Sequence, residues 1–172
     1  MRKRKKLIGV IGPNASACTE EIYHFGIALG KALVDEGYVI VNGGMKGIME
    51  AVFKGAHQSE AYTFGTTVAI IPHDEKEYAN EYADIVIPTG IGIARNQVIV
   101  NTADIIVAVA GGAGTLSELA FAWQKGKSVV CATQFGGWAQ ALAGKQLDKR
   151  RTEQFGVADN LADILQFLKH ND

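Results

Sequence analysis

The sequence predicts a single α/β domain, in which a doubly wound parallel sheet of six or seven strands carries helices on both faces. Short apolar runs without polar alternation recur along the chain, which is typical of strands buried on both faces. Segments with helical apolar periodicity separate these runs, and this alternation predicts parallel strands joined by right-handed crossovers. Many of the 20 glycines stand where a strand gives way to a helix. Together these features are typical of a Rossmann-like fold.

Length and composition limit the classes of protein that fit. The 172 residues suit one domain over 1–172, with a basic tail at 1–6 that we expect to be disordered. The net charge of −1 provides no field that would attract nucleic acid. Two cysteines without a CxxC spacing, and no recognisable secretory signal, favour a cytoplasmic location. No apolar stretch approaches the ~18 residues of a membrane span, so we expect no membrane association.

Six or seven strands are expected. The first, at 7–11, is apolar throughout, and the third and fourth end at Pro72 and Pro88, because proline cannot donate a hydrogen bond within a sheet. The seventh is short and follows an ambiguous stretch at 134–153. In chain order, the expected strands are 7–11, 38–41, 66–71, 84–87, 104–109, 128–132 and 155–158.

Five helices are expected between and after these strands. The first begins at Thr19, a good N-cap residue that two acids follow at the positive end of the helix, and it ends near Gly37. The fourth carries Trp123 on its apolar stripe, which places that indole in the core or in an interface. In chain order, the expected helices are approximately 19–37, 49–56, 90–101, 115–126 and 161–168.

The stretch 111–114 contains three glycines, directly follows the fifth strand and leads into a helix. Glycines lack the Cβ atoms that would block a ligand, and the unpaired N–H groups at a helix start attract anions. We therefore predict a phosphate cradle here, with Thr115 as the N-cap of the helix. Glu118 follows three residues later and is the best catalytic candidate. The same spacing also fits a capping box with Thr115, which needs no ligand, and the sequence leaves both interpretations open.

Ligands of doubly wound sheets bind at the carboxyl ends of the strands, where the strand order reverses. We expect the order 3-2-1-4-5, which places the first and fourth strands side by side at that point. Four loops then line the crevice, at 12–16, 42–47, 89–96 and 111–115, and each has glycine at or near its turn. The predicted ligand-binding residues are Gly12, Asn14, Gly43, Gly44, Gly47, Asn96, Gly111, Gly112, Gly114 and Thr115.

Arg95 lies near the start of the helix beside this crevice. Its guanidinium can bind phosphate through two parallel hydrogen bonds. A surface or interface ion pair explains an arginine at this position equally well, so the sequence alone leaves its role open.

Several other classes of site do not fit. The first strand is not followed by GxGxxG, and the chain contains no Gly-Lys-Ser/Thr, which excludes a dinucleotide-dependent dehydrogenase and a P-loop ATPase. The four histidines show no metal-ligand spacing with one another or with cysteine, so we expect no metal site.

Taken together, these motifs resemble the LOG-like (LONELY GUY) family of Rossmann proteins, which are often mislabelled as lysine decarboxylases. The segment 43–49 resembles the family's first glycine motif, 111–118 resembles its PGGxGTxxE motif, and 123–126 resembles the W-x-Q-x-G stretch that follows. The resemblance spans the chain from the first strand to the sixth. The family includes cytokinin-activating phosphoribohydrolases and molybdenum cofactor carrier proteins.

The resemblance implies hydrolysis of the N-glycosidic bond of a nucleoside 5′-monophosphate, which releases a free base and ribose 5-phosphate. It assigns the catalytic pair to Arg95 and Glu118, requires no cofactor, and implies a homodimer or higher homo-oligomer. A carboxylate suits this chemistry, because it stabilises the positive charge that develops on the ribose or activates water. No lysine is placed for a Schiff base, so we reject decarboxylation.

Two departures from the family pattern favour its smaller, carrier-like branch. Ala110 replaces the proline before the glycines, and Asn96 replaces the basic residue after the arginine. Carriers of that branch bind a phosphorylated pterin cofactor without known turnover. The alternatives are therefore a protein that carries a molybdopterin-type ligand, and a nucleotide-sensing protein that acts on a partner. In each case we expect a small phosphorylated ligand.

Overall fold

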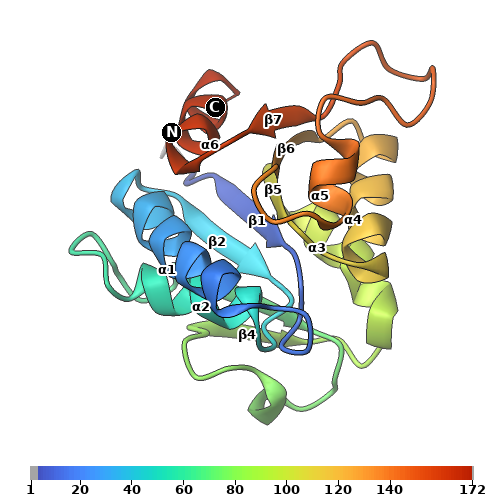
Figure 1. Ribbon diagram of the computed structural model, residues 1–172. Helices are drawn as coiled ribbons and strands as arrows, with labels where there is room; N and C mark the ends of the chain where they lie inside the picture. The colour runs from blue at the N-terminus through green and yellow to red at the C-terminus, as the bar shows by residue number, and fades with distance from the viewer. Residues whose placement is uncertain (1–3, 172) are drawn as a thin grey trace.

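The computed structural model describes residues 4–171 and contains one seven-stranded sheet. Its strands are β1 (Leu7–Ile11), β2 (Val39–Asn42), β3 (Thr67–Ile71), β4 (Ile85–Pro88), β5 (Ile105–Val109), β6 (Ser128–Ala132) and β7 (Gly156–Ala158). They lie in the order β4-β3-β2-β1-β5-β6-β7 (Figure 1), and every neighbouring pair is parallel. The predicted α/β class with a doubly wound parallel sheet is confirmed.

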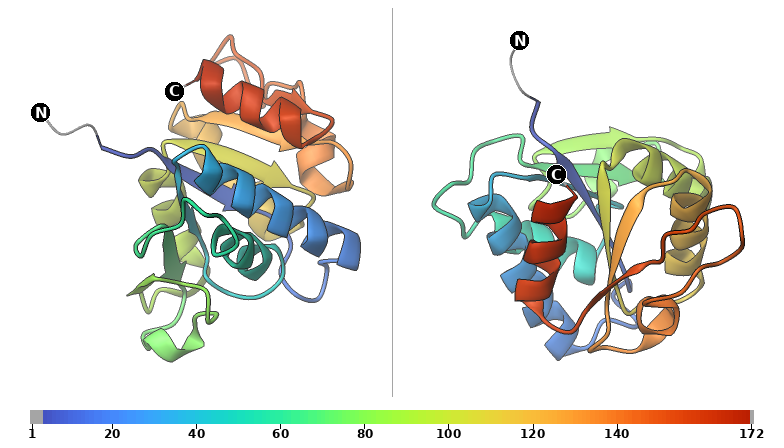
Figure 2. Two further views of the ribbon diagram at one scale, coloured as in Figure 1. Left: turned by 90° about the vertical axis from the view of Figure 1, so that its left-hand side faces the viewer. Right: turned by 90° about the horizontal axis from the view of Figure 1, so that it is seen from above.

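Helices cover both faces of this sheet. They are α1 (Glu20–Asp35), α2 (Ile48–Ala56), α3 (Arg95–Thr102), α4 (Ala113–Gln124), α5 (Gly137–Leu142) and α6 (Leu161–His170), with two short 3-10 helices, η1 (Lys76–Tyr78) and η2 (Gly92–Ala94). Helices α1, α2 and α6 lie on one face and α3, α4 and α5 on the other (Figure 2). The core splits accordingly into two clusters, one with residues of the first three helices and one with residues of the other three. None of the helices within 4–171 is both long and apolar enough to cross a membrane.

Local chemistry sets the boundaries of α1. Its N-cap is Thr19, whose side-chain oxygen accepts a hydrogen bond from the backbone N–H of Ile22 at 3.3 Å, as the sequence predicted. The helix ends at Asp35, and Gly37 follows in the left-handed conformation with a φ of 88°.

Glycines bring the backbones of α1 and α2 into contact. A Cβ atom at Gly30 would lie 1.9 Å from the carbonyl oxygen of Val52, and one at Gly55 would lie 1.9 Å from that of Ile27. No side chain fits at either position. The contact fixes α2, which begins directly after the glycine turn that follows β2.

The predicted strand order is wrong at one point. The neighbour of β1 at the reversal of strand order is β5, and β4 lies instead at the edge of the sheet beside β3. On β4, Ile85 is 41% and Ile87 is 42% exposed, whereas every residue of β5 is buried. Strand β5 contributes residues to both core clusters and is buried on both faces, whereas β4 is apolar too but stays partly exposed at the edge.

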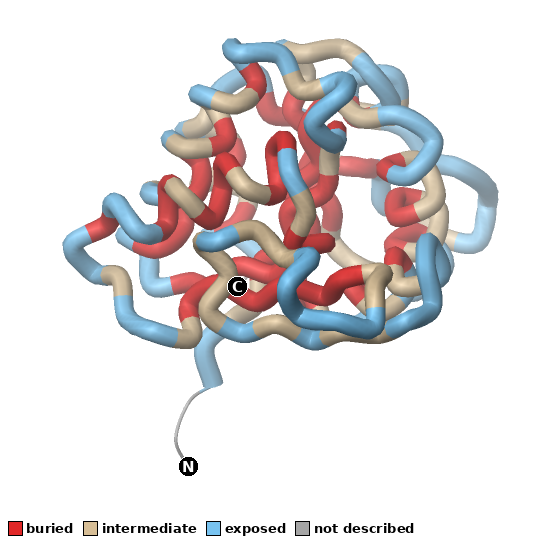
Figure 3. The backbone as a smooth tube through the Cα atoms, turned by 90° about the horizontal axis from the view of Figure 1, so that it is seen from below, coloured by how far each residue is buried: buried red, intermediate tan, exposed pale blue. Residues whose placement is uncertain are grey.

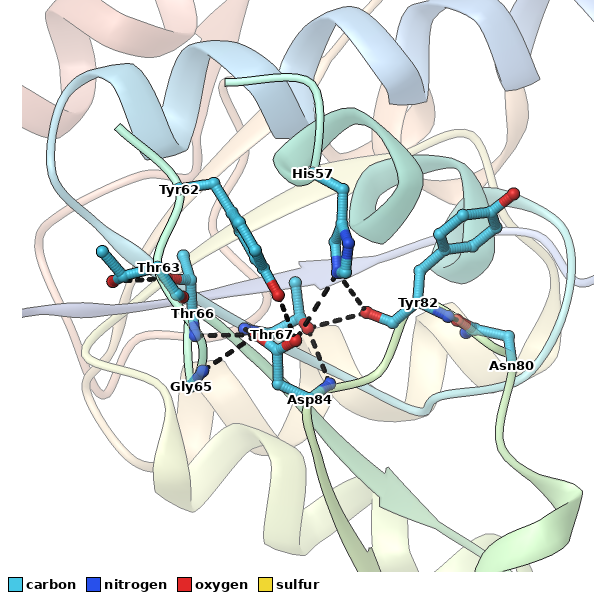
Figure 4. Close-up of polar contacts among 9 residues, drawn as sticks. All are labelled: His57, Tyr62, Thr63, Gly65, Thr66, Thr67, Asn80, Tyr82 and Asp84. Carbon is cyan, nitrogen blue, oxygen red and sulfur yellow. Dashed lines mark hydrogen bonds and ion pairs between the residues drawn. The ribbon is translucent and has the colours of Figure 1, made fainter. Parts of the chain in front are cut away.

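Polar contacts gather around the buried carboxylate of Asp84 at the amino ends of β3 and β4 (Figure 4). One carboxylate oxygen accepts hydrogen bonds from the backbone N–H groups of residues 65–67 at 2.9–3.1 Å. The other accepts one from the hydroxyl of Tyr62 and lies 3.6 Å from Nε2 of His57. These contacts tie the loop before β3 to the start of β4.

The buried residues lie in the middle of the molecule, and the exposed residues surround them (Figure 3). Trp123 belongs to this core at 2% exposure, and its indole N–H donates to the carboxylate of Asp148 at 2.9 Å. Part of the expected basic tail, 1–3, lies outside the described residues. Lys6 is the last residue of the expected tail 1–6, and its carbonyl oxygen accepts a hydrogen bond from the N–H of Val39 at 3.0 Å.

Candidate functional site

A cavity of about 320 Å³ lies at the carboxyl edge of the sheet, where β1 and β5 are neighbours. All four loops that the sequence singled out contribute to its wall, because the carboxyl ends of parallel strands share one edge. The lining residues are Val10, Ile11, Gly12, Pro13, Asn14, Ala17, Gly43, Met49, Ile93, Arg95, Asn96, Gly112, Ala113, Gly114, Thr115 and Glu118.

Three predicted ligand-binding glycines, Gly44, Gly47 and Gly111, are not among these lining residues. Each is packed against other residues of the same protein. A Cβ atom at Gly47 would lie 2.6 Å from the backbone of Asn14, and one at Gly111 would lie 2.2 Å from Oγ1 of Thr115. These glycines let the turns pack tightly behind the cavity wall, whereas the other nine predicted residues line the cavity.

The start of α4 differs from the prediction. Its N-cap is Gly112, which has no side chain that could cap the helix. Thr115 lies inside the first turn and Glu118 in the second, so the predicted N-cap at Thr115 and the alternative capping box are both wrong. The space where a Cβ atom would stand at Gly112 and at Gly114 is open to 4 Å. A glycine cap thus leaves the first N–H groups of α4 accessible, which favours an anion there.

The turn into α4 carries backbone strain at Ala110, whose φ is 46°. This conformation costs an alanine about 1–2 kcal/mol that glycine avoids. We expect Ala110→Gly to raise the free energy of unfolding by about 1 kcal/mol. We expect Ala110→Pro to lower it by about 3 kcal/mol, because proline fixes φ near −65°. Urea unfolding measures both changes, and a less stable Ala110→Gly variant would contradict the strain.

Asn42 fixes the glycine turn that follows β2. Its side chain is fully buried, its oxygen accepts from the N–H of Gly44 at 2.8 Å, and its amide nitrogen donates to the carbonyl of Met49 at 3.0 Å. The turn is thereby tied to the first turn of α2. Sequence analysis identified the glycines here but missed Asn42, although an asparagine before glycine is a signal for such a turn.

Arg95 is the first residue of α3, and its guanidinium lies against Gly43. A Cβ atom at Gly43 would lie 2.5 Å from Nη2 of Arg95, so only glycine leaves room for the guanidinium. Nη1 donates to the side-chain oxygen of Asn96. Nε is buried and has no hydrogen-bond partner within 4–171. Burial lowers the pKa of Arg95 and the charge of Glu118 opposes this effect, but an arginine stays charged in either case.

Glu118 lines the same cavity and is only 7% exposed. Burial raises the pKa of its carboxyl to about 8, against the opposing effect of the positive Arg95. The carboxyl therefore retains its proton at neutral pH. A buried acid with a raised pKa beside a guanidinium is typical of a catalytic proton donor.

The sequence model of the SLOG cluster4 family matches residues 5–164. The chain belongs to this family. An uncharacterized protein of Archaeoglobus fulgidus is 44% identical over 122 residues, which cover 71% of this chain and 76% of that protein. A cytokinin riboside 5′-monophosphate phosphoribohydrolase of Mycobacterium marinum is 30% identical over 160 residues, which cover 85% of this chain and 84% of that protein.

Solved structures extend the comparison. The molybdenum cofactor binding protein of Rippkaea orientalis matches with a TM-score of 0.83 and 29% identity, over 98% of each chain. The resemblance to the LOG-like family is therefore confirmed. This SLOG cluster4 protein is similar in sequence to the phosphoribohydrolases and in structure to a cofactor-binding protein.

Sequence analysis of the SLOG cluster4 protein did not assign a role to seven apolar residues of the cavity wall, which are Val10, Ile11, Pro13, Ala17, Met49, Ile93 and Ala113. Met49 is 9% exposed and packs beside Gly43, whereas Ile93 is 88% exposed. The available signal for Ile93 was an apolar residue in a short glycine-containing loop. Together these side chains give the cavity an apolar part beside its polar groups.

Proposed function

We propose that the protein binds a nucleoside 5′-monophosphate at the carboxyl edge of its sheet and hydrolyses the N-glycosidic bond. One observation carries this proposal: Arg95, Glu118 and the open start of α4 line one cavity. The name of the Mycobacterium marinum relative supports the same class of reaction. A volume of about 320 Å³ is at the lower end of the range for ligand sites, which suits a mononucleotide.

The phosphate is assigned to the first turn of α4. Gly112 and Gly114 let phosphate oxygens approach the backbone, and the positive end of the helix dipole favours their charge. Arg95 is the one cationic side chain among the lining residues, and its unpaired Nε needs an acceptor. A phosphorylated ligand supplies acceptor oxygens to the first N–H groups of α4 and to Nε of Arg95.

Glu118 is assigned the role of general acid. Its carboxyl holds a proton at neutral pH and can donate it to the base nitrogen as the bond from that nitrogen to the ribose breaks. Water adds to the ribose carbon and returns a proton to the carboxylate. The balance is one nucleotide and one water consumed, with one base and one ribose 5-phosphate released.

A carrier function is the second candidate. Two observations favour it: the structural match to the Rippkaea orientalis protein, and the neutral Asn96 beside Arg95 where the phosphoribohydrolases carry a basic residue. A carrier would retain a phosphorylated pterin without breaking it down. Oxidation of protein purified from a cofactor-producing strain, followed by pterin fluorescence, detects such a ligand.

Incubation with AMP tests the enzymatic proposal. We expect free adenine and ribose 5-phosphate in equal amounts, with a rate that falls as the pH rises through about 8, because the acid form of Glu118 is then lost. The Glu118→Gln variant is expected to lose at least about 100-fold in rate, since it cannot donate the proton.

The matched control is Glu60→Gln, which neutralises an exposed glutamate. It should keep the parent rate. If adenosine, guanosine, cytidine and uridine monophosphates all give no more free base than Glu118→Gln does, the enzymatic proposal is wrong.

A further inference from the structure

A chain of hydrogen bonds joins the start of α4 to Arg95 through Asn96 and Ser117. The amide nitrogen of Asn96 donates to Oγ of Ser117 at 3.0 Å, and that hydroxyl donates to the carbonyl oxygen of Gly114 at 2.7 Å. The side-chain oxygen of Asn96 accepts from Nη1 of Arg95. Asn96 is only 6% exposed, where α3 packs beside α4.

The chemistry of these groups fixes the direction of each hydrogen bond. Arginine only donates, so the atom of Asn96 that faces Arg95 is the oxygen, and the amide nitrogen faces Ser117. The hydroxyl of Ser117 then accepts from Asn96 and has its own proton left for Gly114. Removing one group therefore changes the hydrogen bonding of the next group in the chain.

We propose that Asn96 and Ser117 are positioning residues, which hold the guanidinium of Arg95 in a fixed place relative to the anion site at the start of α4. Gly114 belongs to the turn where the phosphate is assigned, and the hold on Nη1 leaves Nε of Arg95 free for a ligand. The anion site rests on the proposed function, whereas the hydrogen bonds that link Arg95, Asn96, Ser117 and Gly114 are formed without any ligand.

The proposal changes the role of Asn96. The sequence predicted that it binds the ligand, whereas its amide contacts Arg95 and Ser117. Ser117 does not line the cavity, so it affects a ligand only through the groups to which it is bonded. Substitutions of Ser117 therefore isolate positioning from direct contact.

Nuclear magnetic resonance of the arginine Nε–Hε groups tests the inference without any ligand. The buried Nε–Hε of Arg95 should give a sharp signal, assigned by its absence in Arg95→Met. Ser117→Ala should shift and broaden that signal, because Asn96 loses its anchor, and Ser117→Thr should restore it by keeping the hydroxyl. An unchanged signal in Ser117→Ala overturns the inference, and so does a signal that Ser117→Thr fails to restore.

Calorimetric titration with AMP measures the consequence for the site. Ser117→Ala should weaken AMP binding about 5-fold, the effect of one neutral hydrogen bond, and should have no further effect in an Arg95→Met background. An equal effect with and without Arg95 overturns the coupling. If the parent protein binds no AMP, the proposed function fails, whereas the resonance comparison still decides the positioning role.

Discussion

Replacement of Glu118 by glutamine is expected to stabilise the protein at alkaline pH, by on the order of 4 kcal/mol. Burial raises the pKa of the Glu118 carboxyl from an ordinary 4.5 to about 8 in the folded chain. Between these two values the folded state holds one proton more than the unfolded state, so the free energy of unfolding falls as the pH rises. Glutamine does not titrate, and it removes this fall.

Urea and thermal unfolding across this pH range measure the effect. The parent protein and Glu118→Gln should have equal stability near pH 4.5 and should diverge until about pH 8, where the difference amounts to roughly 10 °C in Tm for a chain of this size. Glu60→Gln, at an exposed position, should show no such divergence. A difference between parent and Glu118→Gln that stays constant with pH would show that burial does not raise this pKa.

The same substitution is expected to stabilise the protein and to abolish base release. Both results together would show that the carboxyl of Glu118 lowers stability where its neutral isostere packs equally well, and so serves chemistry and not folding. Measuring stability and base release in Glu118→Gln therefore distinguishes a functional role of this glutamate from a structural one. Its spacing from Thr115 in the sequence could not distinguish the two.

Local chemistry made much of the fold predictable. Thr19 caps α1 because its side chain reaches the N–H of a residue three positions on, a rule that needs only the neighbouring sequence. The bounds of β1 and β6 also agree with the prediction, because each strand is a short, largely apolar run without polar alternation. The carboxyl ends of parallel strands share one edge, so the four loops of the site were also predictable.

Features that depend on distant contacts were not predictable. The place of β4 at the edge leaves Ile85 41% and Ile87 42% exposed, which the apolar sequence of this strand does not reveal. The N-cap of α4 is Gly112 and not Thr115, because the helix begins three residues earlier than the spacing suggested. The hydrogen bond between Ser117 and Asn96 depends on the packing of α3 against α4. It was not predictable, because the two residues are 21 positions apart in the sequence.

Replacement of Asp84 by alanine is expected to lower the free energy of unfolding by about 4 kcal/mol. The carboxylate is 4% exposed and accepts hydrogen bonds from three successive backbone N–H groups, those of residues 65–67, and from the hydroxyl of Tyr62 (Figure 4). Alanine removes this acceptor from the N–H groups of Gly65 and Thr67 and from the hydroxyl of Tyr62, whereas the N–H of Thr66 keeps the carbonyl oxygen of Thr63 at 3.2 Å. Asp84→Asn keeps one acceptor oxygen, but it loses the charge and turns an amide group toward the remaining donors, so we expect a loss of about 2 kcal/mol.

Asp74→Ala is the matched control, because Asp74 is exposed and close in sequence, and its loss should change stability by less than about 0.5 kcal/mol.

The Asp84 contacts lie at the amino ends of β3 and β4, whereas the cavity lies at the carboxyl edge. Well below its lower Tm, the folded Asp84→Asn variant should therefore bind AMP as the parent does. Equal stability of Asp84→Ala and Asp74→Ala would show that the loop before β3 holds without its carboxylate. A weaker affinity for AMP in folded Asp84→Asn would instead show that the edge strand transmits its position to the loop that leads to Arg95.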